Sequence, residues 1–247
     1  MVQLLRHRRG EVMVALGNFL YRTRLYVFPL ACLLVFLPGP RIWQDDLVAA
    51  VLGFAIALAG QVVRAGTIGL VYIVRGGKNR QVYAKDLVTD GVFGHSRNPM
   101  YVGNLLILSG MAVTSNCWTT VLVAIPLTAF IYRAIVAAEE NYLRGRFGAD
   151  FDAYCARVPR FVPRLQGLGE TFSSMDFRWR RVVVKEYGTP TAWVLVWCAI
   201  VAWNLTRHDQ AALRPWALPM LEIVAILAVI GWATARILKK TGRVVAD

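Results

Sequence analysis

The stretch "NPMYVGNLLILSGMAVTSNCWTTVLVAIPLTAFIY", Asn98 to Tyr132, is the longest run of this chain without a charged residue. A helix needs about 20 residues to cross a bilayer whose hydrocarbon core is about 30 Å thick. The run is therefore too long for one crossing, and Thr114, Ser115 and Asn116 interrupt its apolar pattern near the middle. We expect a hairpin of two membrane helices, both short and either kinked or partly enclosed by protein.

The rest of the chain has the composition of a polytopic membrane protein. Of its 247 residues, 57% are hydrophobic and 17% are charged, which is more apolar than is usual for a soluble domain of this length. Four further apolar runs predict four more crossings, over residues 25–40, 47–74, 188–206 and 215–235. The expected fold class is an all-α polytopic membrane protein with about six transmembrane helices and a helical hairpin in its core.

We expect one membrane domain in five parts. Residues 1–24 form an amphipathic N-terminus on the cytoplasmic surface, where Val12, Leu16 and Phe19 share one helical face. Residues 25–75 hold two membrane helices, and residues 76–165 form the core with the hairpin. Residues 166–187 form a cytoplasmic connector, and residues 188–247 hold two additional membrane helices.

The distribution of positive charge predicts the orientation of these helices. The net charge is +13, and six crossings place 23 Lys and Arg residues on the side of the two termini against 3 on the other side. Excess Lys and Arg mark the cytoplasmic side of a membrane protein. We therefore expect an integral membrane protein, of the inner membrane if the chain is bacterial, with both termini in the cytoplasm. Anionic lipid headgroups explain the basicity, so nucleic acid is not an expected partner.

Polar residues gather where the hairpin begins and ends. Pro99 suits the first turn of a helix and Asn98 the cap before it. Such a helix start favours an anion, and Arg97 adds a guanidinium fork for the same anion. Alternatively, Arg97 only anchors the helix at the level of the headgroups. Within the second helix, Arg64 is open to two interpretations: either it forms a structural ion pair or snorkels to the membrane surface, or it has a role in a site.

The returning arm of the hairpin ends in Glu139 and Glu140. Adjacent helical residues cannot share one face, so at most one of the two readily points towards the start of the hairpin's first helix. We expect the other to be solvated or paired with Arg144. An arginine and a helix start opposite a carboxylate would suit a zwitterionic amino acid ligand. No metal site is expected, because the cysteines and histidines form no close pair.

The stretch from Leu87 to Leu165 resembles the catalytic core of the integral-membrane methyltransferases that include isoprenylcysteine carboxyl methyltransferase and the phospholipid N-methyltransferases. The resemblance covers about 80 of the 247 residues, in the family's order and spacing. The matching residues are Gly91, Phe93, Arg97, Asn98, Pro99, Tyr101, Gly103, Glu139, Glu140, Phe147, Gly148, Tyr154, Val158 and Pro159.

This resemblance implies S-adenosylmethionine as the cofactor and a lipid or lipid-linked molecule as the methyl acceptor. No Gly-x-Gly-x-x-Gly motif follows a strand, so we do not expect the cofactor to be bound by a Rossmann fold of the kind found in soluble enzymes. Arg97, Glu139 and Arg133 are the candidate catalytic residues. The residues that the resemblance implies for cofactor binding are Lys78, Lys85, Asp86, Leu87, Val88, Phe93, Asn98, Pro99, Met100, Tyr101 and Glu139.

The chain departs from the family at one position. The isoprenylcysteine enzymes have a substrate-contacting arginine four residues before the first motif glutamate, where this chain has Ile135. Arg133 is two residues earlier and about 200° around the helix from Ile135. A carboxylate without a cationic partner would cost several kcal/mol of desolvation. An amine headgroup is therefore slightly preferred as acceptor.

Three alternatives remain at this point. The first is an isoprenylcysteine-type carboxyl O-methyltransferase. The second is an NADPH-dependent membrane reductase of the same superfamily. The paired glutamates favour methyl transfer over this alternative. The third is a transporter or lipid-binding scaffold, which the charged residues Arg64, Arg133 and Glu222 within apolar helices would fit.

Overall fold

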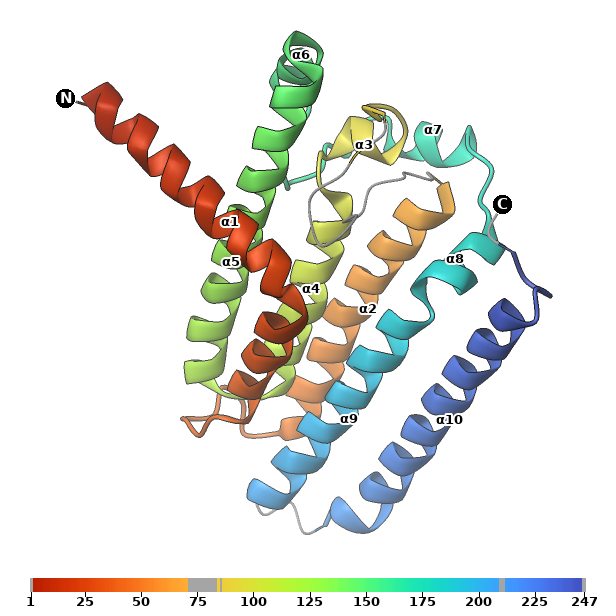
Figure 1. Ribbon diagram of the computed structural model, residues 1–247. Helices are drawn as coiled ribbons and strands as arrows, with labels where there is room; N and C mark the ends of the chain where they lie inside the picture. The colour runs from red at the N-terminus through yellow and green to blue at the C-terminus, as the bar shows by residue number, and fades with distance from the viewer. Residues whose placement is uncertain (1, 71–83, 85, 209–211, 246–247) are drawn as a thin grey trace.

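The computed structural model describes residues 2–70, 84, 86–208 and 212–245. These residues form a bundle of helices (Figure 1), and within them the β-type contacts are limited to an isolated bridge between Arg41 and Cys117. In chain order the elements are α1 (Val2–Cys32), η1 (Leu33–Phe36), α2 (Asp46–Leu70), α3 (Val92–His95), α4 (Pro99–Thr114), α5 (Trp118–Phe147), α6 (Ala149–Arg157), α7 (Leu168–Ser173), α8 (Trp179–Glu186), α9 (Gly188–Arg207) and α10 (Arg214–Lys240).

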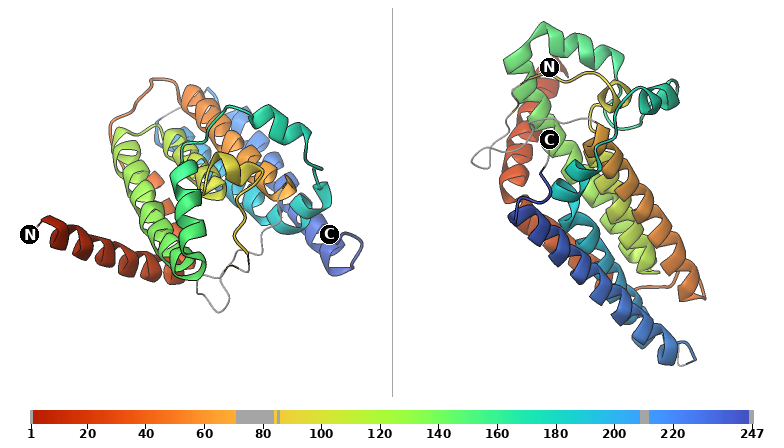
Figure 2. Two further views of the ribbon diagram at one scale, coloured as in Figure 1. Left: turned by 90° about the horizontal axis from the view of Figure 1, so that it is seen from above. Right: turned by 90° about the vertical axis from the view of Figure 1, so that its right-hand side faces the viewer.

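Five segments are long and apolar enough to cross a membrane: Gly10–Phe36, α2, α5, α9 and α10. The sixth predicted crossing corresponds to α4, which is apolar but shorter. Successive long helices run in opposite directions, so both chain ends lie at the end of the bundle that also holds α3, α6 and α7 (Figures 1 and 2). The prediction of an all-α polytopic membrane protein is confirmed. The cytoplasmic location of the termini stays a prediction.

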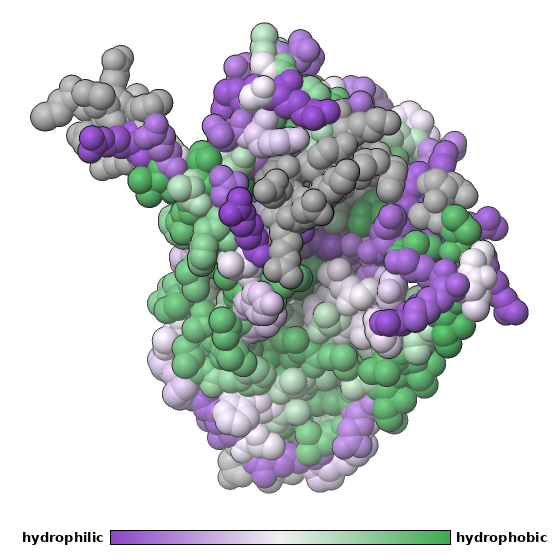
Figure 3. Space-filling view, in the orientation of Figure 1, coloured by the Kyte–Doolittle hydropathy of each residue, from purple (hydrophilic) through white to green (hydrophobic). Residues whose placement is uncertain are grey.

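Figure 3 agrees with this membrane arrangement. Hydrophobic side chains form a broad belt around the middle of the visible face, and hydrophilic side chains gather towards its ends. The helix α10 packs along α9 through a small cluster that includes Cys198, Leu205 and Leu221. Many of its other large apolar side chains, such as Ile226 and Ile230, are exposed, as expected for a helix that faces lipid.

Two helices differ from their predicted lengths. The expected boundary between residues 24 and 25 is not a break, because α1 continues from Val2 to Cys32. The expectation that both arms of the hairpin are short holds for α4, with 16 residues, but is wrong for α5, with 30. The Ala, Glu, Leu and Arg residues that follow Tyr132 favour a helix, so α5 extends beyond the apolar run to Phe147.

The turn of the hairpin lies at the predicted position and is fixed by Asn116. This residue has a positive φ of 50°, a conformation that asparagine tolerates better than most residues. Its side-chain oxygen accepts hydrogen bonds from the N–H groups of Ile42 and Trp43, and its amide donates to Asp46 Oδ1 at 2.7 Å. The Asp46 carboxylate also contacts His208 Nδ1 at 2.9 Å. One side chain thereby joins the hairpin turn to the start of α2.

The helices α2 and α4 pack closely through glycines. Gly103 and Gly110, seven residues apart, form a small-residue face on α4. The partner face on α2 consists of Gly53 and Gly60, which are also seven residues apart. A Cβ atom on Gly110 would lie 2.5 Å from the Gly53 carbonyl oxygen. Because these glycines have no side chains, the two backbones can touch.

Arg64 forms a structural ion pair, which decides between the two interpretations of this residue. Its Nη2 lies 2.5 Å from Glu186 Oε1 and its Nε donates to Glu186 Oε2 at 2.9 Å, with both side chains buried. Arg64 also donates to the Asn104 amide oxygen. The pair joins α2, α4 and α8 below the polar end of the bundle.

Candidate functional site

The two segments that flank the hairpin meet at the polar end of the bundle, as their sequence positions predicted. The hydrogen bonds that join them include Arg97 N–H to the Pro159 carbonyl (2.9 Å), the Asn98 side-chain amide to the Arg160 carbonyl (3.0 Å) and the Ser96 hydroxyl to the Phe161 carbonyl (3.1 Å). These bonds link the turn before α4 to the loop after α6. We call this junction the mouth.

The start of α4 follows the prediction in position but not in detail. Pro99 is the first helical residue and Asn98 occupies the cap position. The Asn98 side chain, however, does not cap the helix, because its amide points to the Arg160 carbonyl instead. The Arg97 N–H is also already bound to Pro159. The Asn98 side chain and the Arg97 N–H therefore both serve to join the two segments.

Glu139 faces the first turn of α4. The Tyr101 hydroxyl donates a hydrogen bond to Glu139 Oε1 at 2.6 Å, and both side chains are half-buried. The Tyr101 ring also lies against Tyr132, with 5.1 Å between ring centroids. The structure thus brings together Tyr101 and Glu139, two residues that the resemblance implicated in cofactor binding.

Glu140 has a different environment from the predicted one. Its side chain is 8% exposed, and its oxygens accept hydrogen bonds from Arg160 Nε at 2.9 Å and Arg160 Nη2 at 2.5 Å. Arg97 Nη1 lies 3.1 Å from the same carboxylate. The expectation that this glutamate is solvated or paired with Arg144 is therefore wrong. Arg144 pairs with Asp152 instead, because α6 folds back beside the end of α5.

Arg97 is enclosed within the mouth rather than exposed at the headgroups. Besides Glu140, its guanidinium donates to Cys155 Sγ at 2.5 Å. Burial raises the pKa of the Cys155 thiol, and the nearby Arg97 charge opposes that rise. Arg97 Nε is buried and has no hydrogen-bond partner among the described residues. Arg97 therefore keeps one donor that a ligand could use.

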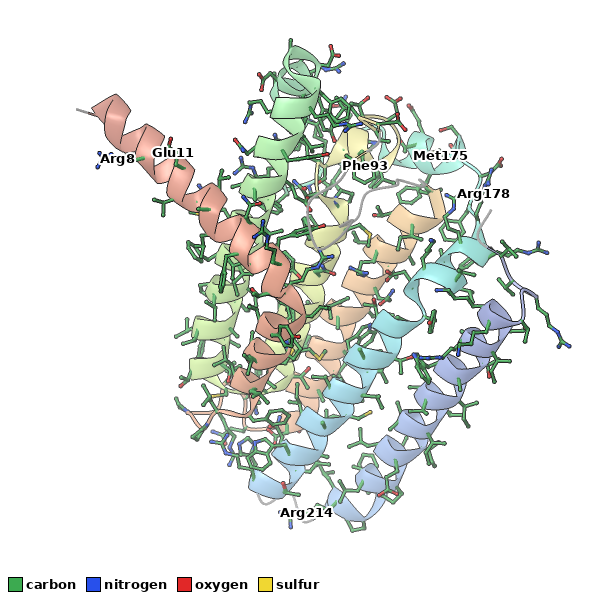
Figure 4. All side chains as sticks on the ribbon, in the orientation of Figure 1. Arg8, Glu11, Phe93, Met175, Arg178 and Arg214 are labelled. Atoms are coloured by element: carbon green, nitrogen blue, oxygen red, sulfur yellow. The ribbon has the colours of Figure 1, made fainter. Side chains whose placement is uncertain are left out.

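The other predicted site residues differ in their burial and contacts. Phe93, labelled in Figure 4, is buried in α3, where its carbonyl accepts a hydrogen bond from the Tyr154 hydroxyl at 2.8 Å. Pro99 is buried and Met100 half-buried in the first turn of α4. Leu87 packs against the apolar cluster of α5 and α6. Val88 is half-buried, Asp86 is exposed, and Lys78 and Lys85 lie outside the described residues.

Arg133 lies apart from this group. Its side chain is exposed on α5, six residues before Glu139 and about 120° around the helix from it. The structure therefore does not bring this candidate catalytic residue into the mouth.

The sequence interpretation missed a contribution from α1. The Arg24 guanidinium lies 4.2 Å from the centre of the Tyr21 ring. Tyr21 and Ile135 belong to one apolar cluster, and Tyr101 packs against that cluster. In the sequence, Arg24 contributes only to the positive charge of the predicted cytoplasmic side. Nothing in the local sequence indicated that α1 lies beside the hairpin.

His95 stabilises the loop around the mouth. One ring nitrogen contacts the Arg164 carbonyl and the other the Thr171 hydroxyl, each at 2.8 Å. Both nitrogens therefore serve to fasten α3 to the chain around α7.

Comparisons with known proteins identify relatives of the chain. The phospholipid methyltransferase family model matches residues 48–150, which include most of α2, the start of α4 and both glutamates. Over 158 residues the chain is 33% identical to the cobalt-zinc-cadmium resistance protein CzcN of Cupriavidus metallidurans, covering 61% of this chain and 68% of that protein. It is 27% identical over 153 residues to the nickel-cobalt-cadmium resistance protein NccN of Alcaligenes xylosoxydans xylosoxydans, covering 61% and 69%.

A shorter match concerns an enzyme. Over 78 residues the chain is 35% identical to protein-S-isoprenylcysteine O-methyltransferase of Schizosaccharomyces pombe, covering 31% of this chain and 33% of the enzyme. No solved structure matches the chain. The family match spans the glycine-packed helices, the start of α4 and the paired glutamates described above. The chain therefore belongs to the phospholipid methyltransferase family of membrane proteins.

Proposed function

We propose that this protein transfers a methyl group from S-adenosylmethionine to a lipid or lipid-linked acceptor at the mouth. The observation that best supports the proposal is the Tyr101–Glu139 hydrogen bond of 2.6 Å in the mouth that also contains Arg97. A carboxylate and a guanidinium with an unused Nε donor fit the amino and carboxylate groups of a zwitterionic cofactor. The family relation makes a membrane methyltransferase the activity to test.

In this proposal, the side chains of the mouth act mainly by binding and orienting the cofactor. In the proposal, Glu139 and Arg97 bind its charged ends, while Phe93, Met100 and Tyr101 provide apolar and aromatic surface. Asn98 and Pro99 shape the helix start beneath it, and residues 86–88 together with Lys78 and Lys85 complete the candidate set. S-adenosylmethionine supplies an electrophilic methyl group on a sulfonium centre. An aromatic face such as that of Tyr101 favours a cation, and an enclosed site excludes water.

An amine headgroup remains the preferred acceptor in this proposal. Ile135 is 1% exposed and packs among Leu20 and Tyr21, so this position provides no cation for a carboxylate. Arg133 does not compensate, because it lies on another flank of α5. One observation favours the alternative carboxylate acceptor: Arg24 brings a guanidinium to Tyr21, next to the cluster that contains Tyr101 and Ile135.

Cofactor binding tests the first part of the proposal. Purified protein is titrated calorimetrically with S-adenosylmethionine and separately with NADPH. We expect binding of S-adenosylmethionine, weakened by about 1 to 3 kcal/mol in Glu139→Gln and in Asn98→Ala, because each change leaves a polar partner unmatched. Glu170→Gln, an exposed position on α7, is the control. Binding of NADPH alone would favour the reductase, and binding of neither would favour the transporter or scaffold.

The acceptor is identified by following the label from tritiated S-adenosylmethionine in membranes. Label on lipid amines is the expected result. Base-labile label that is released as methanol from a farnesylcysteine analogue, with none on lipid amines, would instead establish the carboxyl methyltransferase. In that case Arg24→Gln should abolish transfer to the analogue.

A further inference from the structure

A groove of about 850 Å³ lies between the N-terminal half of α1 and the C-terminal half of α5. The two helices touch at Gly17, where a Cβ atom would lie 2.0 Å from the Ala134 carbonyl oxygen. Beyond this contact the N-terminal half of α1 diverges from the bundle (Figures 1 and 2), and Glu11, labelled in Figure 4, belongs to the diverging part. The close contact at Gly17 therefore sets the inner end of the groove.

The groove contains one arginine whose charge no other described residue neutralises. Arg133 lines it next to the Gly17 contact and makes no hydrogen bond or ion pair with any described residue. The other two arginines of the lining are already paired, Arg160 with Glu140 at 2.5 Å and Arg144 with Asp152 at 2.7 Å. A planar guanidinium without a partner binds a phosphate or carboxylate through paired hydrogen bonds.

The position of Arg133 indicates a membrane-bound anion. Arg133 belongs to the candidate membrane span α5, where an unpaired charge is costly. Arg144 is 11 residues further along, which places it about 16 Å nearer the polar end of the bundle. Between them the groove has apolar side chains, including Met13, Val14 and Ala137, together with the amides of Asn18 and Asn141. The carboxylates of Glu11 and Glu140 also line the groove, and Glu140 is bound to Arg160. Apolar walls around an arginine suit an amphiphile better than a free ion.

We propose that the α1–α5 groove binds the phosphate-bearing headgroup of a membrane phospholipid, with Arg133 as the phosphate ligand. The groove lies on a different flank of α5 from the Tyr101–Glu139 contact, about 120° around the helix. The inference is therefore independent of the proposed methyl transfer. Glu140 belongs to both places, because it lines the groove and also binds Arg97 in the mouth.

The experiment measures lipid binding to the purified full-length protein in neutral detergent by native mass spectrometry. The probes are phosphatidylglycerol, a diacylglycerol with the same acyl chains, and inorganic phosphate. We expect phosphatidylglycerol to bind and the two other probes to bind at least about tenfold more weakly, since only the first combines phosphate with acyl chains. Equal retention of diacylglycerol would overturn the role of the phosphate. Equal binding of inorganic phosphate would overturn the assignment to a lipid.

Two variants locate the site. Arg133→Gln should weaken phosphatidylglycerol binding by at least about tenfold, and Ala137→Trp should do the same by filling the groove while keeping the arginine. Arg146→Gln removes an equal charge from the same helix outside the groove lining and should leave lipid binding unchanged. Unchanged binding in both Arg133→Gln and Ala137→Trp would refute the proposal. Because the readout is lipid binding, failure of the protein to bind S-adenosylmethionine would refute only the proposed function.

Discussion

Replacing Glu140 by glutamine tests the ionic contact that holds the mouth together. The substitution keeps the shape of the side chain but removes the charge shared by Arg97 at 3.1 Å and Arg160 at 2.5 Å. Removing one partner of a buried ion pair usually costs about 3 to 5 kcal/mol, because the other charge stays buried. The Arg97 side chain is 13% exposed, but that of Arg160 is 36% exposed and can be solvated. We therefore expect a loss of about 2 to 4 kcal/mol of unfolding free energy.

The assay is reversible unfolding in detergent micelles, followed by the loss of helical circular dichroism. Asp152→Asn is the matched control, because it removes the carboxylate of the Arg144 pair, in which both side chains are more than half exposed at 51% and 56%. This control should cost less than about 1 kcal/mol. The double variant Arg97→Gln/Glu140→Gln should lose less than the sum of the single variants, since the two residues contact each other. The reasoning fails if Glu140→Gln is no more destabilising than Asp152→Asn.

Three further predictions concern the packing, the hairpin turn and the chemistry of the mouth. Gly110→Leu should destabilise the protein by about 3 kcal/mol in the same unfolding assay, because α2 leaves no room for a side chain, whereas Gly231→Leu, with open space around it, should not. Asn116→Ala should cost about 3 kcal/mol there, since it removes buried hydrogen bonds and strains a residue with positive φ; a loss below 1 kcal/mol would contradict this account of the turn. Iodoacetamide labelling of Cys155, followed by mass spectrometry, should rise with pH through a midpoint above that of a free cysteine, because the raised pKa delays formation of the thiolate. Arg97→Gln should move this midpoint higher still, and a lower midpoint would contradict the assigned contact.

Much of the architecture could be predicted because it depends on local patterns. The length of apolar runs set the number of crossings, and the polar residues Thr114, Ser115 and Asn116 marked the turn of the hairpin. Because a hairpin returns to the side from which it starts, the two flanking segments had to meet, and their hydrogen bonds confirm this. The seven-residue spacing of Gly103 and Gly110 likewise places both glycines on one face of α4, which allows a close helix contact. In each case the physical cause lies within one or two neighbouring segments.

The details of the candidate site depended on contacts between distant parts of the chain. The local sequence showed that Glu139 and Glu140 must point in different directions, but not where each would point. The loop after α6 decides this, because it places Arg160 beside Glu140 and leaves Glu139 to Tyr101. Likewise, the crossing of α1 over α5 at Gly17 places Arg24 near the mouth and opens the groove at Arg133. The sequence by itself determined the helices and the end of the bundle at which the polar motifs meet. Only the tertiary structure decided which charges are paired, because that depends on how helices far apart in the chain pack together.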